Sequence, residues 1–100
     1  MIVNIYCFRD IQVPVFQKPF YDTNEPKKVQ TMTARRIKIA TPEEVSKNHL
    51  ADLELYYLGT YDDETGVIVS NPTFLLRCSD YVRKENPDAK SVQGESEKEA

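Results

Sequence analysis

The sequence lacks the residues on which several classes of protein depend. It has one histidine, His49, and two cysteines far apart in the chain, Cys7 and Cys78. Because no second histidine and no paired cysteine stands at ligand spacing, neither a metal site nor a histidine-based catalytic site is indicated. No apolar run approaches transmembrane length, and the apolar residues after Met1 are interrupted too early for a signal peptide. We therefore expect a cytoplasmic protein with reduced thiols.

Signatures of specific nucleic-acid recognition are also missing. The sequence has no glycine-rich phosphate loop, no zinc finger and no recognition-helix motif, so readout of a particular base sequence is not indicated. The net charge of −3 argues against indiscriminate binding to nucleic acid or to an anionic membrane. Any binding to a polyanion therefore depends on how the charge is distributed.

That distribution is strongly uneven. Residues 43–64 hold seven acidic residues and one basic residue, whereas residues 27–38 hold five basic residues and no acidic one. The basic segment is either a solvated helical face without a function or a face that contacts phosphates. Tyrosine and phenylalanine can stack on single-stranded bases, but their placement relative to the basic face is left open by the sequence. The candidate nucleic-acid-binding residues are Lys27, Lys28, Arg35, Arg36 and Lys38.

A β-hairpin is the clearest structural prediction. Residues 53–61 alternate between two sets of strand-forming side chains, which is the period of a β-strand. The acidic run Asp62-Asp63-Glu64 leads into Thr65-Gly66, where glycine can adopt the positive φ of a tight turn. A second strand over about 66–70 and a first strand over about 2–8 complete a three-stranded antiparallel sheet. Residues 10–24 contain Pro14 and Pro19 and are expected to form an extended loop, held to the core by Val15, Phe16, Phe20 and Tyr21.

Three segments favour helices. Residues 23–40 have a cap candidate at Thr23 or Asn24 and a proline suited to the first turn, although residues 37–39 alternate as a strand would. Thr41 and Glu44 have the spacing of a capping box, which predicts a two-turn helix ending near residues 48–49. Asn71-Pro72 has the order of a helix start and predicts a last helix to Val82. Its buried face would comprise Phe74, Leu75, Cys78, Tyr81 and Val82.

These elements predict a single α+β domain over residues 1–84, with a small three-stranded antiparallel sheet and two main helices on one face. Residues 85–100 are polar and contain one valine and no aromatic residue, so we expect a disordered tail. A domain of this size has a small core and an exposed sheet edge, which makes homodimerisation through an edge or a tyrosine-rich face an additional hypothesis.

The remaining chemically distinctive residues have structural explanations. His49 is expected at the surface beside a helix end, and both cysteines are expected to be small buried apolar residues. The acids of residues 62–64 are consecutive, unlike the alternating ligands of a calcium loop, and so predict a solvated hairpin tip. The sequence therefore predicts no enzyme activity, no metal and no cofactor.

The order of these elements resembles the small nonstructural protein of gokushovirus-type microviruses, which are single-stranded-DNA phages. The resemblance covers about 80 residues and is most distinctive over residues 58–66, LGTYDDETG. Supporting segments are Ile5-Tyr6 to Phe8, Lys18-Pro19-Phe20-Tyr21, Ala34-Arg35-Arg36 and the proline-containing turn with the apolar segment Asn71 to Val82. The chain departs from the family at Ile37, where a bulky aromatic residue is usual, and in its glutamate-rich tail.

The resemblance implies a non-virion protein of the host cytoplasm that acts late in replication, when single-strand synthesis is coupled to packaging into the procapsid. It implies contacts with viral DNA, with replication proteins or with both, and no membrane. The leading prediction is weak, sequence-independent DNA binding through the basic segment. The alternative is an adaptor that binds a viral or host replication factor without touching DNA.

Overall fold

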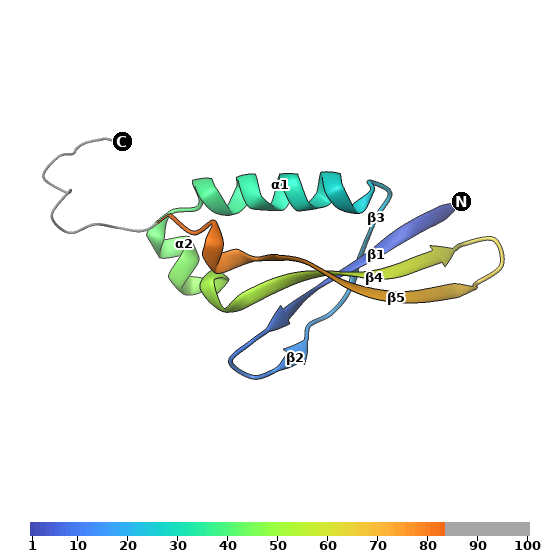
Figure 1. Ribbon diagram of the computed structural model, residues 1–100, viewed down its shortest axis with the longest axis horizontal. Helices are drawn as coiled ribbons and strands as arrows, with labels where there is room; N and C mark the ends of the chain where they lie inside the picture. The colour runs from blue at the N-terminus through green and yellow to red at the C-terminus, as the bar shows by residue number, and fades with distance from the viewer. Residues whose placement is uncertain (84–100) are drawn as a thin grey trace, which may run out of the picture.

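The computed structural model describes residues 1–83, which form a twisted antiparallel sheet with one helix along a face and a shorter one at its end (Figure 1). The sheet has five strands in the order β2-β1-β4-β5, and β3 pairs with β1 as well. In chain order the strands and helices are β1 (Ile2–Asp10), β2 (Val15–Phe16), β3 (Phe20–Asp22), α1 (Pro26–Ile39), α2 (Pro42–Lys47), β4 (Leu53–Asp62) and β5 (Ile68–Arg77). Two short 3₁₀ turns, Leu50–Asp52 and Cys78–Asp80, precede β4 and follow β5.

Strand β1 lies at the centre of the sheet. One of its edges pairs with β4 over the whole strand, and the other is divided between β3 and β2. The predicted β4–β5 hairpin is confirmed, with a turn at residues 63–65 and Gly66 at a φ of +77°. Among the described strands β5 pairs only with β4, so it is the outermost strand on its side of the sheet.

The prediction of a small three-stranded sheet is wrong, because residues 10–24 add two strands. Pro14 and Pro19 lie on either side of β2, and this spacing leaves room for two short stretches of pairing with β1. A proline is tolerated outside a strand, where no ladder hydrogen bond is required. Of the four side chains expected to hold this segment to the core, only Phe20 packs against it, while Val15, Phe16 and Tyr21 are exposed.

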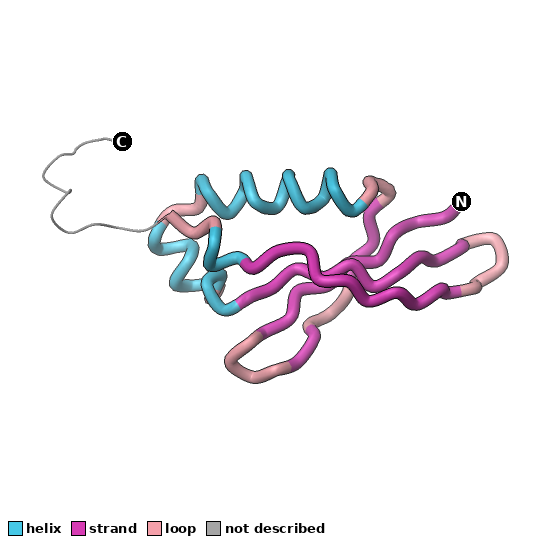
Figure 2. Tube along the Cα trace, in the orientation of Figure 1, coloured by secondary structure: helices cyan, strands magenta, loops and turns pink. Residues whose placement is uncertain are grey.

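The predicted helix over residues 71–82 is also wrong: Figure 2 shows a continuous strand through most of this segment, which is β5. Pro72 is accommodated because β5 is an edge strand, where a missing N–H costs least. The pairing shifts register so that Leu55 opposes Leu76 and Tyr56 opposes Phe74. This bulge inserts an extra residue, Leu75, which interrupts the alternation of side chains expected of a strand.

The two earlier helix predictions are confirmed. Helix α1 has Pro26 in its first turn, although its N-cap residue is Glu25 and makes no side-chain capping bond, so the predicted caps at Thr23 and Asn24 are wrong. Helix α2 has the complete capping box: the Glu44 backbone N–H donates to the Thr41 hydroxyl, and the Thr41 N–H donates to the Glu44 carboxylate. Neither helix within residues 1–83 is long and apolar enough to cross a membrane.

The core lies between α1 and one face of the sheet. Its most buried members in the sheet are Tyr6 and Leu55, and α1 contributes Val29 and Ile37. In the described part of the chain the helices cover only this face of the sheet, and the side chains that alternate with the core residues point to the opposite face. The predicted polar tail lies outside the described residues.

Candidate nucleic-acid interface

Helix α1 presents most of the basic segment to solvent. Val29 and Ile37 are buried against the sheet and fix the rotation of the helix about its axis. Side chains three, four and seven positions apart share a side of a helix. The spacing of each basic residue from Val29 and Ile37 therefore determines which side of α1 it occupies. The two basic residues of the last turn, Arg36 and Lys38, also interact favourably with the helix dipole.

Three of the five candidate residues line one shallow groove. Lys27, Arg35 and Lys38 surround it, and Tyr81 from the segment after β5 forms its other wall. The Lys38 ammonium lies 5.5 Å from the centroid of the Tyr81 ring, a cation–π distance. The groove therefore combines three cations with an aromatic ring, the two kinds of group that contact the backbone and the bases of nucleic acid.

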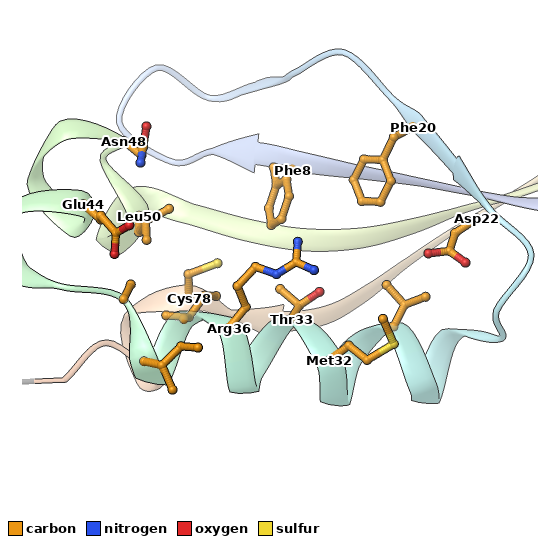
Figure 3. Close-up of a pocket in the computed structure, with 14 residues that line it drawn as sticks. Phe8, Phe20, Asp22, Met32, Thr33, Arg36, Glu44, Asn48, Leu50 and Cys78 are labelled. Atoms are coloured by element: carbon orange, nitrogen blue, oxygen red, sulfur yellow. The ribbon is translucent and has the colours of Figure 1, made fainter.

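Lys28 belongs to the same surface, whereas Arg36 does not. Lys28 is exposed and lies seven residues before Arg35, on the same side of the helix. We call these four residues, Lys27, Lys28, Arg35 and Lys38, the basic surface. Arg36 lies on the other flank of α1 and projects into a separate cavity of about 500 Å³ (Figure 3). The structure thus brings four of the five predicted residues together.

The cavity beside Arg36 is mainly apolar. Phe8 and Phe20 of the sheet lie above the guanidinium in Figure 3, and Met32 lies beside it on the helix. Glu44 also lines the cavity, but its carboxylate is bonded in the capping box. Arg36 therefore faces a different environment from the basic surface, which spacing along the sequence alone did not distinguish.

The basic surface has no acidic partner in the described part of the chain. The salt bridges within residues 1–83 are made by the N-terminus and by two arginines of the sheet, Arg9 and Arg77. None involves the four residues of the basic surface. As far as residues 1–83 are concerned, their charge is consequently available to an external anion, and salt in solution screens it.

Tyr81 is the residue of this groove that sequence reasoning missed. The predicted helix over residues 71–82 places Tyr81 on its buried side; in the structure Tyr81 is half-buried, packs against the core and also lies beside Lys38. The residue follows a 3₁₀ turn at the end of β5, and its position depends on where that strand ends. No signal within the local sequence indicates this contact.

The two cysteines are buried and free, as predicted. The Cys7 thiol donates a hydrogen bond to the Gln17 carbonyl at 2.8 Å, and burial raises its pKa. Burial, followed by the nearby Glu54 carboxylate, raises the pKa of Cys78 from 9.0 to about 11. Neither thiol therefore resembles the exposed, low-pKa cysteine of a nucleophilic site.

This shift predicts that the Cys78 thiol is protected at mildly alkaline pH. Thiolate is the reactive form, and the higher pKa leaves roughly 100-fold less of it in the folded state at pH 8. The contribution of Cys78 to stability is complete below pH 9 and is lost as the pH rises towards 11, because the unfolded thiol ionises first. Alkylation rates measured with and without urea test this. Equal rates in both conditions would contradict it.

The histidine and the acidic residues of the hairpin tip are surface groups. His49 is exposed and adopts a left-handed backbone conformation, with a φ of 53° before a 3₁₀ turn. Asp63 and Glu64 are at the exposed hairpin tip and pair with the N-terminal ammonium at 2.7 and 3.2 Å. A hydrogen bond from the Glu64 backbone N–H lowers the pKa of Asp62. Within residues 1–83 no three metal-ligating side chains cluster.

A family model described as Phage ORF5 protein matches residues 3–81. The match spans nearly all of the described structure, from β1 to the groove residue Tyr81. No curated protein and no solved structure shows significant similarity to the chain.

Proposed function

The chain belongs to the Phage ORF5 protein family, and from this premise we propose that it is a non-catalytic accessory protein that binds viral DNA weakly and without sequence preference. We place its action in single-strand synthesis and genome packaging in the host cytoplasm. The similarity of LGTYDDETG to the small nonstructural protein of microviruses supports that finer assignment.

The observation that carries the proposal is the unpaired basic surface on α1. Four cations on about three turns of one helix, with no acidic partner in residues 1–83, form a local positive field on a chain whose net charge is −3. A field of this kind attracts a phosphate backbone while the rest of the molecule limits non-specific adhesion. The absence of a base-reading motif fits binding that does not depend on sequence.

The expected strength and salt dependence follow from the number of cations. If all four contact phosphates, log K falls with log salt with a slope of about −3 on single strands and about −4 on duplex. Such binding is strong at low ionic strength and weak at physiological salt. This behaviour suits a protein that acts at high local concentration beside a replication complex or a procapsid.

Removal of the basic surface is expected to weaken DNA binding at least about tenfold at low salt. The variant carries Lys27→Gln, Lys28→Gln, Arg35→Gln and Lys38→Gln, and titration of labelled single- and double-stranded oligonucleotides at two salt concentrations measures the loss. The matched control removes four exposed charges elsewhere. It carries Lys18→Gln, Arg36→Gln, Lys47→Gln and Arg83→Gln.

Both variants have the same net charge, −7, from −3 − 4. Equal weakening of DNA binding by both variants would show that only the total charge matters, and it would contradict the role proposed for the basic surface. Absence of DNA binding by the unaltered protein at low salt would leave the second candidate function, the adaptor. The groove beside Tyr81 would then bind an acidic segment of a replication protein, by the same charges.

A further inference from the structure

The sheet carries an aromatic cluster on the face that neither helix of residues 1–83 covers, which we call the helix-free face. Tyr56 alternates with Leu55, which is fully buried under α1, so the Tyr56 side chain lies on the opposite face. Its register partner on β5 is Phe74, and Phe16 of β2 lies on its other side. We call Phe16, Tyr56 and Phe74 the aromatic row.

The rings of the aromatic row are held by one another but not enclosed. The Phe16 and Tyr56 ring centroids are 5.1 Å apart and those of Tyr56 and Phe74 are 5.7 Å apart, both in edge-to-face geometry. Phe16 and Phe74 nevertheless remain 47% and 48% exposed. Edge-to-face packing fixes the orientation of the outer rings and leaves part of their surface free for a flat partner.

Two arginines flank this row and share one carboxylate. Arg9, Glu54 and Arg77 face one another across β1, β4 and β5. Glu54 is 7% exposed, and its oxygens lie 3.6 Å from Arg9 and 3.3 Å from Arg77. The Arg9 guanidinium also lies 5.8 Å from the Phe16 ring centroid. The cluster thus has a net charge of +1, and the Arg9 guanidinium is positioned beside a ring of the row.

The aromatic rings and the net positive charge together decide between two partners for this face, a second copy of the chain and a single nucleic-acid strand. A second copy packed about a two-fold axis close to Glu54 would place two net-positive clusters against each other and remove four arginines from water, which is electrostatically unfavourable. A single nucleic-acid strand instead supplies phosphates for the arginines and flat bases for the rings. Duplex DNA cannot do so, because its bases are already stacked and paired.

We infer that the helix-free face of the sheet is a binding site for single-stranded DNA, with unpaired bases stacked on Phe16, Tyr56 and Phe74 and phosphates beside Arg9 and Arg77. The inference rests on the proposed DNA binding and adds a strand preference to it. The basic surface on α1 attracts any phosphate backbone, whereas the aromatic row selects a strand whose bases are free.

The test compares single- and double-stranded DNA binding by the full chain. The variant Phe16→Ala with Phe74→Ala is expected to bind a labelled oligonucleotide of about 12 nucleotides at least about tenfold more weakly. Its affinity for a duplex of the same length is expected to change less than about twofold, since a duplex has no free bases to stack. Phe16→Tyr with Phe74→Tyr keeps both rings and is expected to restore the affinity.

Two controls separate stacking from general loss of apolar surface. Val13→Ala with Ile39→Ala removes two side chains that are 65% and 70% exposed elsewhere, and it is expected to bind as the unaltered protein does. An abasic oligomer, which offers phosphates alone, is expected to bind the unaltered protein as weakly as the normal oligomer binds the alanine variant.

Three results would overturn the inference. The alanine variant could bind single strands normally, could lose single- and double-stranded binding equally, or could lose self-association in sedimentation velocity, which would make the face an interface between copies. If only the α1 charge variant weakens binding, the proposed function stands and the inference fails. If only the alanine variant weakens it, the inference stands and the role of the basic surface fails. No binding of any DNA at low salt refutes both.

Discussion

Replacement of Gly59 by alanine is expected to leave most of the protein unfolded. Gly59 adopts a φ of +141°, which L side chains rarely adopt, in the middle of β4. An added Cβ would collide with the backbone carbonyl of Val69 on β5 and would lie 3.2 Å from the Asn71 nitrogen. Backbone atoms of a paired strand cannot move aside as the end of a flexible side chain does, so the edge strand β5 would separate from β4.

The expected cost of Gly59→Ala is about 3–5 kcal/mol, from the unfavourable φ together with the collision. A domain of this size has a total stability of about 5 kcal/mol, so this loss is close to the whole of it. Urea denaturation followed by far-ultraviolet circular dichroism measures the change. The expected trace shows a transition near zero denaturant or no folded baseline.

Gly66→Ala is the matched control, because Gly66 is also at positive φ, +77°, but has nothing within 4 Å of an added Cβ. Its expected cost is about 1 kcal/mol, from the backbone conformation alone. Equal destabilisation by the two substitutions would show that the close approach of β4 and β5 at Gly59 contributes nothing, and would contradict the prediction.

Leu55→Ala is expected to destabilise the domain by about 3–4 kcal/mol. Leu55 is fully buried, opposes Leu76 across β4 and β5, and lies in the core beneath α1. Truncation removes three heavy atoms from a cluster of seven buried residues, and neighbours fixed in a sheet cannot collapse into the space. The midpoint of urea unfolding is therefore expected to fall far below that of the unaltered protein.

The control for Leu55→Ala is Ile39→Ala at the end of α1, where the side chain is 70% exposed. This substitution removes similar apolar volume and is expected to change stability by less than about 0.5 kcal/mol. A loss of the same size at Ile39 would mean that α1 is packed more extensively than the core cluster indicates. A small loss at Leu55 would mean that the core can close around the missing atoms.

Local interactions account for the parts of the fold that were predictable. The capping box of Thr41 and Glu44 lies within four residues, so it needs no distant partner. The β4–β5 hairpin depends on alternation and on a turn that closes locally, and Pro26 suits the first turn of α1 wherever the helix packs. The two helices and the hairpin turn lie near their expected positions, whereas β5 extends to Arg77, well beyond the predicted end near residue 70.

Long-range pairing explains what was not predictable. The segment 71–82 has a proline after an asparagine and a helix-like apolar spacing, yet β4 pairs with its first part. A bulge between Leu76 and Phe74 accounts for the adjacent Phe74 and Leu75 in that spacing, whereas Cys78, Tyr81 and Val82 follow the end of β5. A bulge is defined only by the partner strand. The same holds for β2 and β3, which are too short to be recognised without β1 beside them.

The candidate site, like the fold, could be predicted from the sequence only in part. The sequence alone determined that five cations occur together on one segment, because charge and helical spacing are local properties. Only the tertiary structure decided that Arg36 faces a separate cavity, that Tyr81 completes the groove, and that Phe16, Tyr56 and Phe74 form one row. The physical reason is that the exposure of a side chain depends on which face of the sheet α1 covers, and that choice is made by residues distant in the chain.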